Sequence, residues 1–232
     1  MAVLRHLSLR DFRNYTSLDL DLSEGRIVFS GNNGHGKSNV LEAIAYLGSL
    51  GSFRGAPPDA LIRAGAPAAV IRATVESGDR DLLIEAELVR GRANRIQVNK
   101  QRLGRARDLL GMMPVTVFGP DDLELVKAGP GLRRGYLDDL LVQLHPRNAK
   151  LCSEVDKILK QRNALLRSAG GRMTPDVEST LSVWNSKLGV AGEELGRARQ
   201  HLVARLEPRV NDAYGALAGE GNPVALGYEP AW

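Results

Sequence analysis

An eight-residue segment rich in glycine, at positions 31–38, has the residue types and spacing of a phosphate-binding loop. It reads Gly-Asn-Asn-Gly-His-Gly-Lys-Ser and fits the pattern G-x-x-x-x-G-K-[ST], the P-loop. Glycines let backbone N–H groups wrap closely around phosphate oxygens, and the start of a following helix adds positive potential. A chance glycine-rich turn is the alternative. We expect a nucleotide to be bound by Gly31, Asn32, Asn33, Gly34, His35, Gly36, Lys37 and Ser38.

Three side chains of this loop have different expected roles. Lys37 should reach the β- and γ-phosphates, and Ser38 should ligate Mg²⁺. His35 is expected to contribute its backbone only, so no catalytic role is assigned to it. A guanine-reading Asn-Lys-x-Asp element would indicate GTP, but residues 99–102 read Asn-Lys-Gln-Arg and lack the acid. The expected ligand is therefore ATP with Mg²⁺.

Catalytic carboxylates are harder to identify than the phosphate-binding loop. Residues 115–122 combine an apolar run with two acids and could form a Walker B strand, but Gly119 and Pro120 separate the acids from the run. Walker B carboxylates would polarise the attacking water and complete the coordination of Mg²⁺. We therefore predict no catalytic residue and expect this chain to bind ATP without hydrolysing it.

A basic stretch forms a second candidate site. Seven lysine and arginine residues, and no acid, lie between positions 90 and 107. DNA backbone phosphates would be attracted to such a stretch without any base being read. The alternative is a solvated hairpin whose charges keep an edge strand from pairing. We favour contact with DNA through Arg92, Arg95, Lys100, Arg102 and Arg105.

Composition excludes several classes of protein. No apolar run approaches about 18 residues, which excludes a membrane span, and charge appears too early in the chain for a signal peptide. The single cysteine, Cys152, excludes an intrachain disulfide and a thiolate zinc site, and the 4 histidines lack metal-ligand spacing. A cytoplasmic protein is expected. The net charge of +4 is compatible with nucleic acid as a partner.

The first half of the chain is predicted to form strands around one helix. Residues 18–22 alternate leucine with aspartate, and residues 27–29 are a short apolar strand leading into the P-loop. From Lys37 the apolar period becomes helical. Val40, Leu41, Ile44 and Leu47 form one face, and Gly48 and Gly51 end the helix. Further strands are predicted at 70–75, 81–89, 94–98 and, as a buried strand, 115–118.

The second half is predicted to be helical. Helices are expected at 133–144 and 147–166, and a third begins at Thr174, a good N-cap followed by Pro175. A turn at 168–173 should join the last two into an antiparallel hairpin, ended by Pro208. Either a helix bundle or a projecting coiled coil would satisfy this pattern. The third helix carries a heptad seam of Val177, Leu181, Trp184, Leu188, Ala191, Leu195, Ala198 and Leu202.

These patterns predict an α/β fold: a nucleotide-binding lobe with a P-loop helix and a β-meander, followed by a helical lobe containing the hairpin; the family resemblance described below implies that the first lobe is of the ABC-type ATPase kind. The nucleotide-binding lobe is assigned to residues 1–128 and the helical lobe to 129–232. The last residues, 225–232, are expected to begin a strand, with the chain ending before it returns to the first lobe.

Several sequence blocks resemble a known family. Residues 9–15 and 29–42 are similar to the head of an SMC-like ABC ATPase. Further blocks resemble the RecF family of DNA replication and repair proteins, and together the blocks cover the chain in order. These are residues 48–54, 61–66, 118–127, 129–138 and 159–166.

The resemblance implies properties that the residues alone do not. Proteins of this family are weak, DNA-stimulated ATPases that dimerise around ATP, bind double-stranded DNA and help to load RecA at gaps with RecO and RecR. It implies ATP contacts for Arg13 and Asn14, and places Arg54 near the phosphates or DNA. Recombinational repair, replication and the SOS response would follow as the biological setting.

The resemblance also implies a departure from the family. Family members continue well beyond residue 232, and that continuation should hold the ABC signature, the Walker B carboxylates, the D-loop and the switch histidine. Two rival interpretations stay open. One is a different SMC-like P-loop ATPase, such as a phage-defence ATPase; the other is a P-loop phosphotransferase acting on a small molecule.

Overall fold

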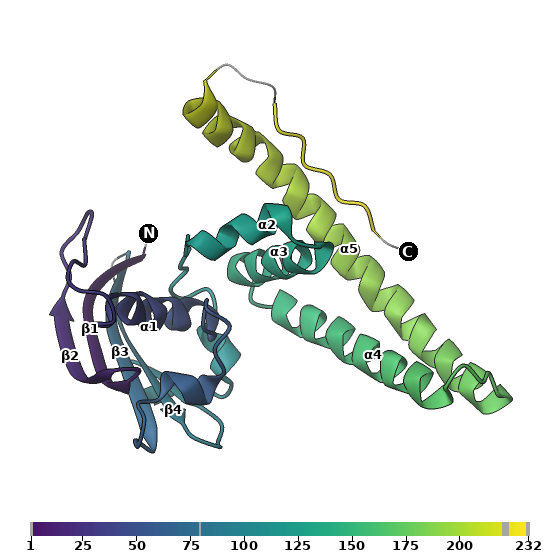
Figure 1. The fold of residues 1–232 in the computed structure, drawn as a ribbon, viewed down its shortest axis with the longest axis horizontal. Helices are drawn as coiled ribbons and strands as arrows, with labels where there is room; N and C mark the ends of the chain where they lie inside the picture. The colour runs from purple at the N-terminus through teal and green to yellow at the C-terminus, as the bar shows by residue number, and fades with distance from the viewer. Residues whose placement is uncertain (1, 79, 220–222, 231–232) are drawn as a thin grey trace. The chain divides into compact units, whose positions relative to one another are not determined.

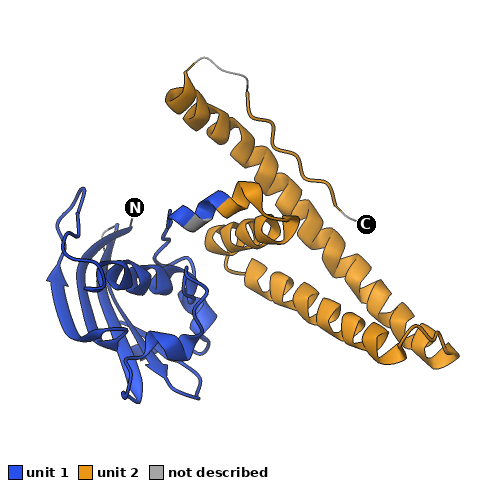
Figure 2. Cartoon of the chain, viewed as in Figure 1, with its two compact units in different colours: residues 1–123 blue, residues 124–232 orange. Residues whose placement is uncertain are grey.

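The computed structural model describes residues 2–78, 80–219 and 223–230. The chain divides into two compact units, Met1–Leu123 and Glu124–Trp232 (Figure 2). The first unit combines a sheet with a helix, and the second is built from helices (Figure 1). The predicted α/β fold class is therefore confirmed, while the assignment of functions to two lobes stays a prediction.

The first unit is organised around an antiparallel sheet. In the described part of the chain the sheet has six strands, in the order β2-β1-β3-β4-β5-β6. Apolar and polar side chains alternate along them, which is typical of a sheet with one buried face. The predicted meander over residues 70–98 is confirmed. The strands are β1 (Ala2–Phe12), β2 (Tyr15–Asp21), β3 (Ala68–Ser77), β4 (Arg80–Val89), β5 (Arg95–Val98) and β6 (Gln101–Arg102).

Helix α1 (Lys37–Ser49) covers one face of this sheet and begins at the end of the P-loop (Figure 1). Its side chains Val40, Ala43, Tyr46 and Leu47 share one core with the inward-facing residues of the strands. Leu41 was predicted on the same face, but it is 48% exposed. That prediction is wrong because adjacent helix residues point about 100° apart, so Leu41 turns away from the sheet when Val40 packs on it.

The opposite face of the sheet is polar. Strand pairing places one row of neighbours across all of its strands, and every member of that row is charged or polar. The row runs Asp19, Ser8, Arg72, Glu85, Gln97 and Arg102.

Two predicted strands are not formed. Residues 27–29 and 115–118 are apolar, yet neither segment pairs with a strand, and Val28 and Phe118 are 84% and 88% exposed. An apolar run shows that a segment is suited to burial, but a strand also needs a neighbour for its backbone groups. Among the described residues neither segment has one. Short 3₁₀ turns occupy Pro58–Leu61, Ala106–Leu109 and Pro120–Leu123.

The second unit contains the predicted helical hairpin. Helices α4 and α5 run antiparallel and are joined by a short turn (Figure 1). Gly170 and Gly171 in that turn have φ values of 55° and 84°, a region that glycine adopts without strain. Thr174 caps the next helix, because its hydroxyl accepts a hydrogen bond from the Val177 N–H at 3.3 Å. The helices are α2 (Glu124–Lys127), α3 (Pro130–Leu144), α4 (Asn148–Ala169) and α5 (Pro175–Ala218).

The heptad seam of α5 faces α4, as predicted, and none of its eight members is exposed. Helix α3 joins the hairpin through Leu141, which clusters with Val155 and Leu195. It is also tied to α5 by Arg199, whose Nε and Nη2 each donate to Asp138 at 2.7 Å. The three helices therefore form a bundle in the region where α3 packs. Beyond α3, helices α4 and α5 continue as a two-helix pair.

Two predictions about the end of the chain are wrong. Helix α5 does not end at Pro208; the proline lies inside it and the helix continues to Ala218, because a proline removes one backbone hydrogen bond and can kink a long helix without ending it. Residues 223–230 form no strand, and residues 231–232 lie outside the described residues. Asn211 instead holds the backbone of Val224 through two hydrogen bonds of 2.7 and 2.9 Å. None of the described helices combines the length and apolarity needed to cross a membrane.

Candidate nucleotide-binding site

The glycine-rich loop adopts a backbone that depends on its glycines. Gly31, Gly34 and Gly36 have φ values of 139°, 84° and 96°, which residues with a Cβ rarely adopt. Gly36 is also crowded: a Cβ there would lie 2.7 Å from Asn14 Oδ1 and 2.8 Å from the Tyr15 ring. The loop can therefore wrap around a ligand only because these positions carry no side chain.

Lys37, at the start of α1, is hydrogen-bonded to the beginning of the loop. Its Nζ donates to the carbonyl oxygens of Gly31 and Asn32, both at 2.8 Å. An ammonium group has three N–H donors, so one remains for a phosphate oxygen. Ser38 is exposed in the first turn of the helix, where N–H groups lack intrahelical partners. Loop, lysine, hydroxyl and helix N-terminus together form a positively polarised site suited to an anion.

The turn between β1 and β2 lies against this loop. Asn14 Oδ1 accepts a hydrogen bond of 2.8 Å from Asn39 Nδ2, and the Tyr15 hydroxyl contacts the His35 carbonyl at 3.5 Å. Asn39 Oδ1 in turn accepts from Arg54 Nη1 at 3.0 Å. Asn14 and Arg54, which the family resemblance suggested separately, therefore both bind the side-chain amide of Asn39.

Arg13 is held by the protein itself. Its Nε and Nη2 each donate to the carboxylate of Glu42 at 2.7 Å, and its Nη1 donates to the Ala60 carbonyl at 2.9 Å. Three of its five N–H donors are therefore used. The remaining two are all that Arg13 can offer to a ligand.

A buried carboxylate, Glu42, sits at the centre of these contacts. It also accepts a hydrogen bond of 2.5 Å from the Ser52 hydroxyl and lies 3.8 Å from Arg54 Nη1. Burial raises the pKa of the Glu42 carboxyl, but the hydrogen bonds from Arg13 and Ser52 and the charge of Arg54 outweigh it and hold the pKa below its ordinary value. Glu42 is therefore ionised at neutral pH.

A pocket of about 660 Å³ opens beside the loop. Its wall combines two arginines, one acid, two asparagines and small or apolar residues. Such a mixed wall suits a ligand with both a flat apolar part and polar edges. The lining residues are Arg13, Asn14, Asn39, Asp59, Ala60, Ile62, Ala64, Gly65 and Arg90.

Four residues of this region were missed as site residues by the sequence reasoning: Asn39, Glu42, Ser52 and Arg90. One of them carried a signal, since Glu42 is an acid one position from the apolar stripe of α1. The other three are polar residues in loops or at a helix start, where polar residues are common. Their gathering depends on contacts distant in sequence, such as the 29-residue separation of Arg13 and Glu42.

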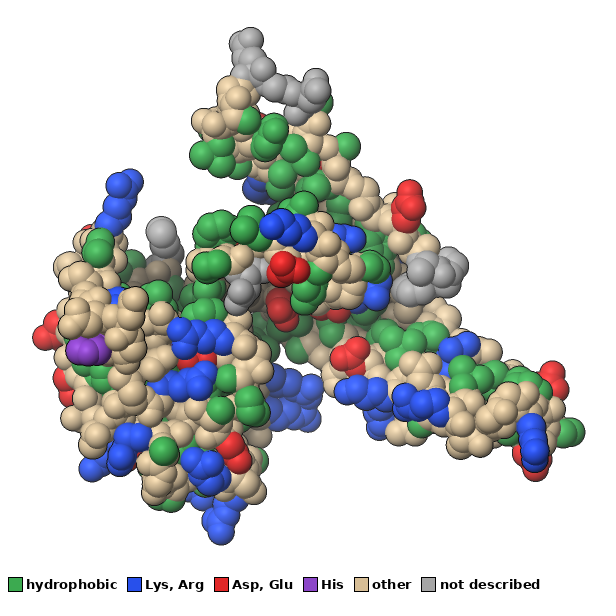
Figure 3. All heavy atoms as spheres, viewed as in Figure 1, with side chains coloured by type: hydrophobic (Ala, Val, Ile, Leu, Met, Phe, Trp, Pro, Cys, Tyr) green, Lys and Arg blue, Asp and Glu red, His purple; other side chains and the backbone are tan. Residues whose placement is uncertain are grey.

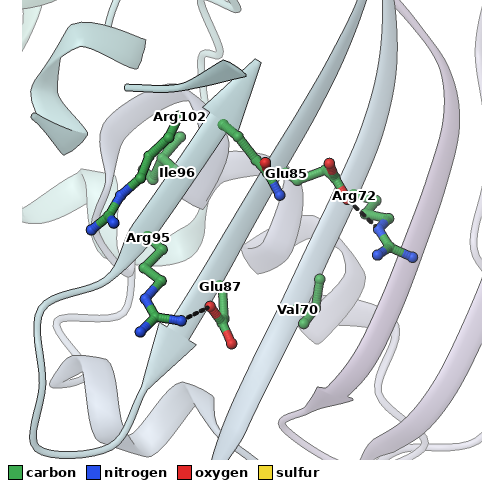
Figure 4. Close-up of a pocket in the computed structure, with 8 residues that line it drawn as sticks. Val70, Arg72, Glu85, Glu87, Arg95, Ile96 and Arg102 are labelled. Atoms are coloured by element: carbon green, nitrogen blue, oxygen red, sulfur yellow. Dashed lines mark hydrogen bonds and ion pairs between the residues drawn. The ribbon is translucent and has the colours of Figure 1, made fainter. Parts of the chain in front are cut away.

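The basic stretch does not form one strip. Arg95 and Arg102 lie on the polar face of the sheet, where they line a pocket of about 440 Å³ with two acids, Glu85 and Glu87 (Figure 4). Arg95 Nη1 lies 3.4 Å from Glu87 and so is partly neutralised. Lys100 lies in the turn between β5 and β6, with φ 66°, while Arg92 and Arg105 lie in exposed loops. On the face of this unit seen in Figure 3, lysine and arginine side chains likewise occur in separate groups.

Comparison with known proteins finds one family. The RecF/RecN/SMC N-terminal domain family matches residues 3–189. The DNA replication and repair protein RecF of Paenarthrobacter aurescens (strain TC1) is 44% identical, over 98% of this chain and 62% of its own length. The protein of the same name from Kineococcus radiotolerans is 46% identical, over 96% of this chain and 58% of its own length. This chain thus spans about three fifths of the length of such relatives.

Solved structures show the same likeness. A structure of "the recombination mediator protein RecF-ATPrS in RecFOR pathway" matches with a TM-score of 0.87 at 28% identity, covering 94% of this chain and 58% of that one. The corresponding RecF-ATP structure matches with a TM-score of 0.85, at the same identity and coverage. An Smc head domain from Pyrococcus furiosus with an extended coiled coil shares the fold alone, with a TM-score of 0.54 at 18% identity over 94% of this chain and 66% of that one.

Proposed function

Because this chain belongs to the RecF family, within the RecF/RecN/SMC N-terminal domain family, we propose that it is an ATP-binding part of a DNA-repair protein. The observation that carries the proposal is the loop at residues 31–38, whose positive φ values require glycine, together with the hydrogen bonds of Lys37 to its first carbonyl groups. The solved RecF structures with the highest TM-scores named above carry ATP or "ATPrS" in their descriptions, which supports ATP as the ligand.

In this proposal the triphosphate lies in the loop. Backbone N–H groups and the third Nζ donor of Lys37 bind its oxygens, and the adjoining pocket takes the base and ribose. Asn14 and the two remaining donors of Arg13 line that pocket and are the protein's polar contacts to them.

Mg²⁺ fits the loop through Ser38. The hydroxyl is exposed beside the phosphate site, and Mg²⁺ commonly takes one such protein ligand together with phosphate oxygens and water. Among the described residues no cluster of three or more acids, histidines or cysteines could hold a metal alone. The metal would therefore arrive with the nucleotide and neutralise its charge.

We further propose that the protein binds double-stranded DNA, dimerises on ATP and acts with RecR and RecO in loading RecA in the cytoplasm. The family membership supports this assignment, and the relatives named above are RecF proteins rather than phage-defence ATPases. The DNA contacts expected from the basic stretch are Arg92, Arg95, Lys100, Arg102 and Arg105, all of which are exposed. Arg54 is better placed to act beside the nucleotide, since it binds Asn39 of α1.

Titration calorimetry with ATP and Mg²⁺ tests the core of this proposal. We expect heat of association with the native chain, and an affinity about 100-fold weaker for Lys37→Ala, since a charge-assisted contact to phosphate is lost. Lys157→Ala removes an exposed lysine on α4 and should leave the affinity unchanged. The proposal fails if the native chain releases no heat, or if Lys37→Ala binds as the native chain does.

A further inference from the structure

Glu42 is a charged side chain that the protein has removed from water. Its relative exposure is 0%, and burial of an ionised carboxylate is costly unless partners replace the lost hydration. Here Arg13 supplies two hydrogen bonds, Ser52 a third, and Arg54 a second positive charge at 3.8 Å. Among the described residues no buried side-chain polar atom lacks a hydrogen bond, so this group is fully compensated.

The contacts of Glu42 join three separate segments. Arg13 belongs to the turn between β1 and β2, Glu42 to the second turn of α1, and Ser52 and Arg54 to the loop that follows α1. Arg13 has φ 54°, an uncommon value for an arginine, so its position needs support from its contacts. The adjacent residue, Asn14, is the one that packs against Gly36 of the P-loop.

One acid is shared here by two guanidinium groups. The cluster therefore keeps one net positive charge, close to Asn39 and one helical turn from Ser38. Without the acid, two like charges would lie close together with no counter-ion between them, and both arginines would turn toward water. The carboxylate thus allows two cations to be held close together beside the phosphate site.

We propose that Glu42 is a positioning residue for nucleotide binding: without touching the ligand, its charge sets the placement of Arg13 and Arg54 beside the P-loop. This inference rests on the proposed function, since it assumes that a nucleotide binds there. It assigns the loss on mutation to the arginines rather than to the carboxylate itself.

A double-mutant cycle distinguishes positioning from general support of the fold. We expect Glu42→Gln, which keeps shape and loses charge, to weaken the affinity for ATP with Mg²⁺ by about tenfold. Arg13→Gln should weaken the affinity for ATP by a similar factor. The double variant should bind only slightly more weakly than Arg13→Gln, because Glu42 then has only its longer contact of 3.8 Å with Arg54 left to lose. Losses that multiply in the double variant would overturn the proposal, as would native affinity in Glu42→Gln.

Three controls complete the test. Glu85→Gln breaks a comparable carboxylate–arginine pair with Arg72 on the far face of the same sheet, and should leave the affinity unchanged. Glu42→Asp keeps the charge and should recover part of the loss caused by Glu42→Gln; no recovery would count against the proposal. Lys37→Ala reports on the proposed function separately: if the native chain binds ATP and Lys37→Ala does not, an unaltered Glu42→Gln overturns only the role of Glu42.

A milder variant covers the case in which Glu42→Gln does not fold. Ser52→Ala removes one hydrogen bond to the carboxylate and leaves its charge in place. We expect an affinity about threefold weaker, with cooperative unfolding retained. Native affinity in a folded Ser52→Ala, when Glu42→Gln is unfolded, would overturn the inference and leave Glu42 with a role in stability only. A native chain that binds no nucleotide would overturn it together with the proposed function.

Discussion

Arginine and glutamate form clusters on both sides of the sheet, and the two clusters differ in burial. On the side of α1, Glu42 is fully buried and is bound by the half-buried Arg13 and Ser52. On the polar face, Glu85 pairs with Arg72 and Glu87 with Arg95, with both arginines more than half exposed. Water solvates the second set whether or not the pairs form, whereas the first set has only its partners. Similar residue types are therefore expected to have unequal effects on stability.

The largest expected effect is on folding. Glu42→Ala should lower the free energy of unfolding by about 3 kcal/mol, because it leaves a cavity at a fully buried position and removes the counter-ion of the half-buried Arg13. Glu87→Ala, which breaks the exposed pair, should cost under about 1 kcal/mol. Urea unfolding followed by circular dichroism measures both. Equal losses in the two variants would remove the distinction between the clusters.

A smaller loss is expected when the buried cluster is disturbed from the P-loop side. Gly36→Ala places a Cβ 2.7 Å from Asn14 Oδ1 at φ 96°, and should cost about 2 kcal/mol of stability as well as most of the nucleotide affinity. Gly189→Ala is the matched control, because its Cβ meets nothing within 4 Å inside α5. That variant should be as stable as the native chain or slightly more so. Unfolding midpoints measure the change in stability, and calorimetry measures the change in nucleotide affinity. Tight ATP binding by Gly36→Ala would contradict the site geometry.

The polar face and the exposed loop that carries Arg105 are expected to act on DNA rather than on folding. Reversing two charges, in Arg102→Glu with Arg105→Glu, should weaken double-stranded DNA binding about tenfold and lower the slope of log K against log salt by about 2. Glu87→Gln frees Arg95 and should strengthen binding slightly. Fluorescence anisotropy over a salt series measures these effects. Unaltered binding in the double reversal would exclude this contact and leave the basic stretch as a solvated hairpin.

The smallest effect should appear as a pH dependence on the same face. His6 contacts Asp21 at 2.8 Å and Asp19 at 2.9 Å, and the hydrogen bond to Asp21 is the main cause of its raised pKa. Since the folded-state pKa lies above the unfolded value of about 6.5, protonated His6 stabilises the fold below that value. The contribution disappears as the pH rises through the folded pKa. His6→Gln should lose this difference in urea midpoints between about pH 6 and pH 8; an unchanged profile would contradict it.

Local patterns predicted much of the fold because short-range geometry dictates it. The spacing of Val177 to Leu202 selects one helix face whatever surrounds it, and Gly170 with Gly171 permits the turn before it. The P-loop was recognisable for the same reason, since each of its glycines supplies a positive φ value that the backbone of this eight-residue loop needs. The strands predicted at residues 27–29 and 115–118 are not formed, because strand pairing depends on a neighbouring strand that an apolar run does not specify.

What the sequence by itself determined is the chemistry of the phosphate loop, the helical hairpin and the alternation that gives the sheet one buried and one polar face. Only the tertiary structure decided that Glu42 would join Arg13 and Ser52, and that acids of β4 would partly neutralise the basic stretch. The physical reason is range. Backbone strain and helical period act within a few residues, whereas burial and ion pairing depend on which distant segments share a low-dielectric space.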